Sequence, residues 1–112
     1  MALNAKVTKV VEELIKEMKA SDEYVNFEKL RKEAMNNPEL SRQIKRTRVI
    51  RDQFSKMNEY ERDSQSAEAL EREYDDLLDN TAVHLFSIAE LELCAMYRDI
   101  MSKVVMNLDL DL

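Results

Sequence analysis

The chain of 112 residues contains no glycine, one proline and no tryptophan. Without glycine, no residue takes a positive φ at low cost, so tight hairpins, phosphate-binding βα loops and glycine helix caps are all disfavoured. Aromatic residues make up only 6% of the chain, whereas methionine occurs seven times. Methionine side chains adapt well at helix interfaces. These features predict an all-α protein with few and simple connections.

The single cysteine excludes an internal disulfide framework and favours a reducing compartment. No apolar run approaches the roughly 18 residues of a transmembrane helix. The N-terminal segment MALNAKVTKVVEEL has charges within its apolar spacing, unlike a signal peptide. We therefore expect a cytoplasmic protein that does not enter the membrane. The net charge of −6 argues against nucleic-acid binding through overall charge, although a local patch could still bind.

Hydrophobic residues form 45% of the chain and charged residues 36%, a mixture typical of amphipathic helices. We predict a single helical domain over residues 1–112, arranged as an antiparallel helical bundle with a long C-terminal helix. Ser21 is a good N-cap, and Asn37 followed by Pro38 should cap and open another helix. A turn or kink is expected at residues 64–66. The predicted helices span residues 3–19, 22–36, 38–63, 66–79 and 81–108.

The last predicted helix carries the longest apolar stripe of the chain, at the three-and-four spacing of one helix face. It would be about 40 Å long, whereas a compact domain of this size has a radius of gyration of about 13–14 Å. A chain of this length has too few other residues to cover the apolar surface of such a helix, so we expect a homodimer or larger oligomer. The predicted interface residues are Phe86, Ala89, Leu93, Tyr97, Ile100 and Val104.

No residue set supports catalysis or a metal or cofactor site. His84 is the only histidine, and ten residues separate it from Cys94, so the two lie about 15 Å apart along one helix and cannot bind one metal ion together. We expect His84 at the surface or in an interface and Cys94 as a small buried hydrophobe. The alternative for Cys94 is a metal ligand or redox thiol shared across subunits. The acidic segment 68–79 is best interpreted as a solvated helix face. It contains Glu68, Glu71, Glu73, Asp75, Asp76 and Asp79.

One basic segment contains five cations and no acidic residue between Leu40 and Arg51. One hypothesis is an anion or RNA contact. The other, which we favour, is charge matching to the acidic segment 68–79, folded back beside it or supplied by another subunit. The chain is poor in the aromatic side chains on which single-strand binders stack bases. The five cations are Arg42, Lys45, Arg46, Arg48 and Arg51.

Two stretches combine apolar spacing with a few marked polar residues. The first runs from Ser21-Asp22-Glu23-Tyr24 and Phe27 through Asn36-Asn37-Pro38-Glu39-Leu40, Gln43-Ile44 and Arg51-Asp52-Gln53-Phe54. The second runs from Leu77-Leu78-Asp79-Asn80-Thr81-Ala82-Val83 to Ala89-Glu90, Leu93 and Ile100. Together these stretches resemble the YlbF/YmcA family of competence regulators. Thr81 stands where many relatives have proline. Some longer relatives carry additional C-terminal cysteines associated with an iron–sulfur cluster, and we do not carry that cluster over to this chain.

The resemblance implies a small bacterial helical protein that acts through protein contacts and self-association. It also implies membership of a regulatory complex that acts in competence, sporulation, biofilm formation or RNA processing. The resulting hypothesis is a non-enzymatic regulatory adaptor without a cofactor. The alternative is an RNA-contacting adaptor that uses the basic segment 42–51.

Overall fold

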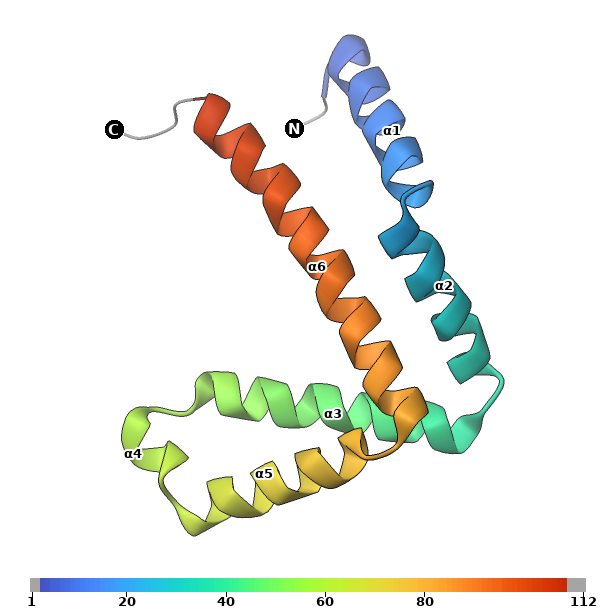
Figure 1. The fold of residues 1–112 in the computed structure, drawn as a ribbon. Helices are drawn as coiled ribbons and strands as arrows, with labels where there is room; N and C mark the ends of the chain where they lie inside the picture. The colour runs from blue at the N-terminus through green and yellow to red at the C-terminus, as the bar shows by residue number, and fades with distance from the viewer. Residues whose placement is uncertain (1–2, 109–112) are drawn as a thin grey trace. The chain divides into compact units, whose positions relative to one another are not determined.

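The computed structural model describes residues 3–108, which are almost entirely helical and contain no β-strand (Figure 1). The predicted all-α class is therefore confirmed for the described part of the chain. The helices are α1 (Ala5–Lys19), α2 (Asp22–Met35), α3 (Pro38–Lys56), α4 (Glu59–Arg62), α5 (Gln65–Leu78) and α6 (Thr81–Asn107).

Asparagine and serine side chains begin the helices of this glycine-free chain. Each accepts a hydrogen bond from a backbone N–H in the first turn of the following helix, at 2.8 to 3.2 Å. Such caps satisfy N–H groups that have no partner within the helix. The prediction of caps at Ser21 and Asn37 is confirmed. The six capping residues are Asn4, Ser21, Asn37, Asn58, Ser64 and Asn80.

The predicted helix over 38–63 is wrong in one respect, because the structure divides it into α3 and α4. Met57 leaves the helical region with φ −79° and ψ 140°. Asn58 then accepts a hydrogen bond from the backbone N–H of Glu61 at 2.8 Å and so begins α4. An asparagine that caps a new turn competes with continuation of the preceding helix. The turn or kink predicted at 64–66 is a turn at residues 63–64, because Ser64 caps α5 and residues 65–66 already belong to that helix.

The described chain forms two compact units, and the division falls within α2 and within α6. Unit 1 comprises the described residues up to Lys29 together with those from Ala89 onward, whereas unit 2 is Leu30–Ile88. Each unit is described by itself below, and the single domain over residues 1–112 stays a prediction.

Unit 2 contains a buried core drawn from the end of α2, from α3 and α5, and from the start of α6. Helices α3 and α5 lie side by side (Figure 1). The hydroxyl of the buried Thr47 donates to the carbonyl oxygen of Ile44 at 2.6 Å, so this polar group is satisfied inside the core. The buried residues are Ala34, Ile44, Thr47, Ile50, Ala67, Val83, Phe86 and Ser87.

Unit 1 has almost no buried core of its own. Among its described residues only Ala89 is buried, and α1 contains no buried residue. In the sequence of α1, apolar residues nevertheless recur along one side of the helix. Unit 1 therefore differs from unit 2 in leaving its apolar side chains uncovered.

Replacement of Ile50 by alanine should strongly destabilise the chain. Ile50 is completely buried, and an Ile→Ala change in a core typically costs about 2–5 kcal/mol because it leaves a cavity. Urea denaturation followed by circular dichroism measures the effect. The matched control is Val49→Ala, because Val49 is 46% exposed on the same helix and surface changes cost less than about 0.5 kcal/mol. Equal losses for the two variants would contradict the assigned core.

Candidate functional site

The predicted interface residues of α6 do not form one surface. Phe86 and Ala89 are only 4% and 1% exposed, so other parts of the chain already cover them. Leu93 and Ile100 are half-buried. Tyr97 and Val104 are exposed. Of the six predicted interface residues, only Tyr97 and Val104, in the second half of α6, are therefore exposed to a partner.

One exposed apolar side of the second half of α6, which we call the α6 face, consists of Tyr97, Met101, Val104 and Val105. The four side chains are between 42% and 55% exposed. At 3.6 residues per turn they fall within an arc of about 100°, beside the half-buried Leu93 and Ile100. The α6 face thus extends the apolar side of the helix beyond what unit 1 itself covers.

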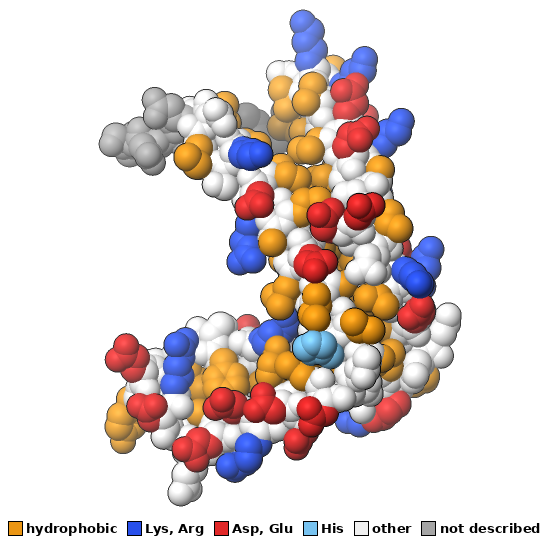
Figure 2. Space-filling view, in the orientation of Figure 1, with side chains coloured by type: hydrophobic (Ala, Val, Ile, Leu, Met, Phe, Trp, Pro, Cys, Tyr) orange, Lys and Arg blue, Asp and Glu red, His pale blue; other side chains and the backbone are white. Residues whose placement is uncertain are grey.

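A second apolar surface, which sequence reasoning did not single out for binding, lies on α1. We call it the α1 face. Its side chains are between 37% and 64% exposed, and Figure 2 shows hydrophobic side chains at the surface along α1. Together with the half-buried Met18 they lie within an arc of about 140°. In the sequence of α1, charged and apolar residues fall on separate sides of the helix. This pattern predicts that the apolar side packs against another part of the protein. The α1 face consists of Val7, Val10, Val11, Leu14 and Ile15.

The five cations of the basic segment are divided between different sides of α3. Arg46 forms a two-point ion pair with Glu73 of α5, at 2.5 Å from Nε and 2.8 Å from Nη2. This contact supports the charge-matching interpretation within one chain. Lys45 and Arg48 lie on another side, where the Arg48 guanidinium is 5.4 Å from the centroid of the Phe86 ring. Arg51 is half-buried.

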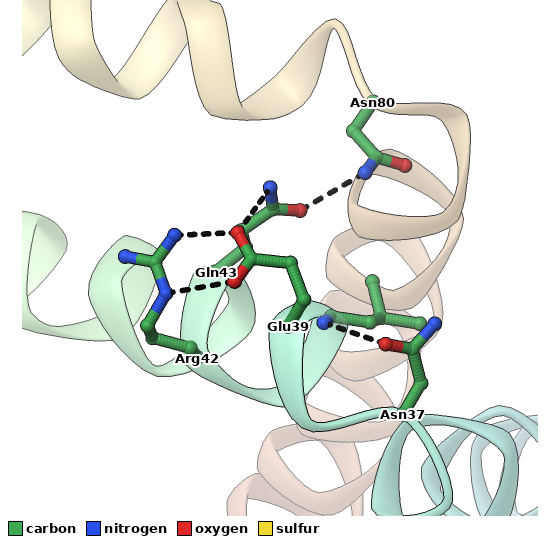
Figure 3. A network of polar contacts seen from close by, with 6 residues as sticks. Asn37, Glu39, Arg42, Gln43 and Asn80 are labelled. Carbon is green, nitrogen blue, oxygen red and sulfur yellow. Dashed lines mark hydrogen bonds and ion pairs between the residues drawn. The ribbon is translucent and has the colours of Figure 1, made fainter.

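Arg42 belongs to a polar network that joins α3 to the start of α6 (Figure 3). The Arg42 guanidinium donates to both carboxylate oxygens of Glu39, and Gln43 also donates to Glu39 at 3.3 Å. The side-chain amide of Asn80 donates to the Gln43 oxygen at 2.9 Å. The hydrogen bonds from Arg42 lower the pKa of the Glu39 carboxyl. Arg42 is thus engaged in a contact that fixes local structure.

The acidic segment on α5 contributes a single ion pair to the described contacts. Glu73 is half-buried and receives Arg46, whereas the other carboxylates of the segment are exposed. Carboxylates are visible along α5 in Figure 2. This arrangement agrees with the predicted solvated acidic face.

His84 and Cys94 both lie exposed on α6. The surface position predicted for His84 is confirmed, whereas the burial predicted for Cys94 is wrong. Cys94 lies in the second half of α6, where unit 1 does not cover the apolar side of the helix. Within residues 3–108, no group of three histidine, cysteine or acidic side chains could hold a metal ion. In the same part of the chain, no helix combines the length and apolar character needed to cross a bilayer.

The Arg46–Glu73 pair should make the titration of Glu73 depend on Arg46. Hydrogen bonding from Arg46 lowers the pKa of the Glu73 carboxyl. The pair therefore stabilises the folded chain above the ordinary pKa of a glutamate, and this contribution is lost as pH falls through the lowered value. In a side-chain NMR titration, Arg46→Gln should raise the pKa of Glu73 toward that of an ordinary glutamate. The control Arg72→Gln should leave it unchanged, and a shift of equal size would contradict the pairing.

Comparison with known proteins places this chain in a family. The profile described as "Control of competence regulator ComK, YlbF/YmcA" matches residues 7–109. No curated protein and no solved structure matches the chain significantly. The family resemblance noted from the sequence is thereby confirmed, and the description of the family gives the chain a regulatory role. Because the match spans nearly all of its length, this protein belongs to the YlbF/YmcA family of control of competence regulators.

Proposed function

We propose that this chain is a non-enzymatic regulatory adaptor that acts through protein–protein contacts and self-association. The family description supports regulation. The observation that supports this mechanism is the exposure of apolar side chains in unit 1. Within residues 3–108, nineteen large apolar side chains are exposed, of which fourteen belong to unit 1 and five to unit 2.

Self-association follows from the cost of leaving these side chains in water. Covering one valine, leucine or isoleucine side chain contributes about 1.5–3 kcal/mol, and a monomer rarely exposes large contiguous apolar patches. The α1 face spans a wider arc than the narrow seam of a two-stranded coiled coil. Several neighbouring helices are needed to cover such an arc. A second copy of the chain supplies them when both copies contribute α1 and the second half of α6 to one antiparallel bundle.

The biological setting of the adaptor is part of the same proposal. We assign it to the bacterial cytoplasm, as one component of a regulatory complex in competence, sporulation, biofilm formation or RNA processing. The RNA-contacting alternative has less support from the structure. Arg42 and Arg46 pair with Glu39 and Glu73, so the basic segment does not present its cations as one strip along a nucleic-acid backbone.

The oligomeric state tests the proposal directly. Size-exclusion chromatography with light scattering should give a mass at least twice the 13.2 kDa of one chain, because the α1 and α6 faces are buried only between copies. The measurement is made over a range of protein concentrations. A mass of one chain at tens of micromolar, with full helical circular dichroism, would refute self-association.

A carboxylate placed on either exposed face should weaken the oligomer. Val104→Asp on the α6 face and Leu14→Asp on the α1 face each put an unpaired charge into the proposed interface, which costs several kcal/mol. The dissociation constant should rise at least about tenfold, since about 1.4 kcal/mol corresponds to that factor. Sedimentation velocity measures it.

The matched control is Ser102→Asp, which places the same charge on the same helix at an exposed residue outside the α6 face. It should leave the dissociation constant unchanged. If all three variants weaken association equally, the effect comes from overall charge and the assigned faces are wrong.

A further inference from the structure

The α1 face has the same apolar spacing when it is read from either end of the helix. Each of its side chains, with the half-buried Met18 included, has an apolar counterpart at the same distance from a midpoint between Glu12 and Glu13. The counterparts are Val7 and Met18, Val10 and Ile15, and Val11 and Leu14. A two-fold interface needs a surface of this kind, because the same patch on both copies must match itself. The α1 face therefore fits a second α1 that runs in the opposite direction.

Four of these side chains form a straight seam along the helix. Their spacings of four, three and four residues are those of the a and d positions of a coiled coil. In an antiparallel pair, the seams of both copies interlock at an interaxial distance of about 8–10 Å. The seam consists of Val7, Val11, Leu14 and Met18, of which the first three are between 37% and 42% exposed. One chain leaves this seam uncovered, so it is complete only with a second α1.

One edge of the α1 face carries charges of opposite sign that suit the same pairing. Lys6 and Glu17 are exposed and lie about three turns apart on that edge. Neither forms an ion pair within residues 3–108. In the antiparallel pair, Lys6 lies about 3 Å along the helix axis from Glu17 of the partner subunit. The two-fold axis creates this ion pair twice, whereas on the other edge Lys19 meets the uncharged Thr8 of the partner subunit.

The direction of the pairing follows from the helix ends. The first turn of α1 contains no acidic residue, and its last turn contains Lys16 and Lys19. A parallel pair would also match apolar residues, but it would align the two helix dipoles and place Lys6 beside the positive N-terminal end of its neighbour. The antiparallel pair places Lys6 near the negative C-terminal end of its neighbour instead, which is favourable. Glu12 and Glu13 lie about a third of a turn away from the seam, so they do not face each other across it.

We propose that α1 packs antiparallel against α1 of a second copy, about a two-fold axis that passes between Glu12 and Glu13. Lys6 pairs with Glu17 of the partner subunit at both ends of this helix pair. The inference rests on the proposed self-association and adds to it the direction and the register of the central contact. A second copy fits better than an unrelated helix, because the apolar spacing and the charged edge of α1 both complement themselves.

Distances between spin labels test the direction of the pairing. Ala5→Cys and Glu12→Cys are made singly in the full-length Cys94→Ser chain, at exposed positions that share one side of α1 outside the α1 face. In the antiparallel pair the two labels at residue 5 lie about 22 Å apart along the helix axis, and those at residue 12 about 2 Å. Pulsed electron paramagnetic resonance should therefore give a distance at least about 10 Å longer for residue 5. Equal distances would indicate a parallel pair and overturn the proposal.

Charge reversal tests the register. Lys6→Glu and Glu17→Lys should each raise the dissociation constant at least about threefold, because two exposed ion pairs become repulsive contacts. Each single change favours the dipole of its own helix end, so weaker association does not come from a weaker α1. The double change Lys6→Glu with Glu17→Lys restores opposite charges and should return the dissociation constant to within about twofold of the unaltered chain. Sedimentation velocity measures all three variants.

The matched control is Lys9→Glu, which reverses the same charge on the side of α1 away from the seam. The register is wrong if this control weakens association as much as Lys6→Glu, or if the double change does not restore it. A chain that oligomerises without bringing the labels at residue 12 close together uses another surface, and then only this inference fails. A chain that stays monomeric refutes the proposed self-association as well, so the two failures are distinguishable.

Discussion

Burial of the apolar side of each helix is the requirement on which this structure depends. In unit 2 the requirement is met within the chain, since α3, α5 and the ends of α2 and α6 enclose Ile50, Val83 and Phe86. In unit 1 it is not met, because the α1 and α6 faces remain largely exposed. A helix gains little stability from its backbone alone and relies on packing of its apolar side. The uncovered faces of unit 1 are therefore the surfaces whose burial by the proposed partner contributes most free energy.

The two units consequently suggest a division of roles. Unit 2 has a core that is independent of any partner, and it fixes the positions of charged side chains around that core. The surface of unit 1 includes two exposed apolar regions, the α1 face and the α6 face. Surfaces of this kind agree with the regulatory role of the family. The proposed adaptor associates through unit 1, while unit 2 supplies a folded core.

The cations of α3 form one run in the sequence, but they make different contacts on different sides of the helix. Arg42 and Arg46 are only four residues apart and share one side of the helix, where they meet carboxylates of Glu39 and Glu73. Lys45 and Arg48 lie on another side, where Arg48 approaches the ring of Phe86. A count of cations along the sequence cannot distinguish these two sets by itself. The helical period separates them, and the packed neighbours decide what each one contacts.

Much of the fold was accessible from the sequence. The lack of glycine, the Asn and Ser caps and the apolar spacing together determine an all-α chain and most helix boundaries, because these are local properties of a few adjacent residues. The break at Met57–Asn58 was missed, since no glycine or proline marks it and a single asparagine cap produces it. The family resemblance was likewise readable from the residues around Asn37 and Asn80.

Only the tertiary structure decided which apolar side chains are covered. Phe86 and Val104 belong to the same sequence stripe, yet one is buried and the other is exposed. The same holds for the cations, since the structure assigns Arg46 to Glu73 and Arg48 to the ring of Phe86. The sequence determined which side of each helix is apolar and which is charged, because a helical period fixes that locally. What each side meets depends on contacts between residues distant in the chain, and these arise only when the helices pack.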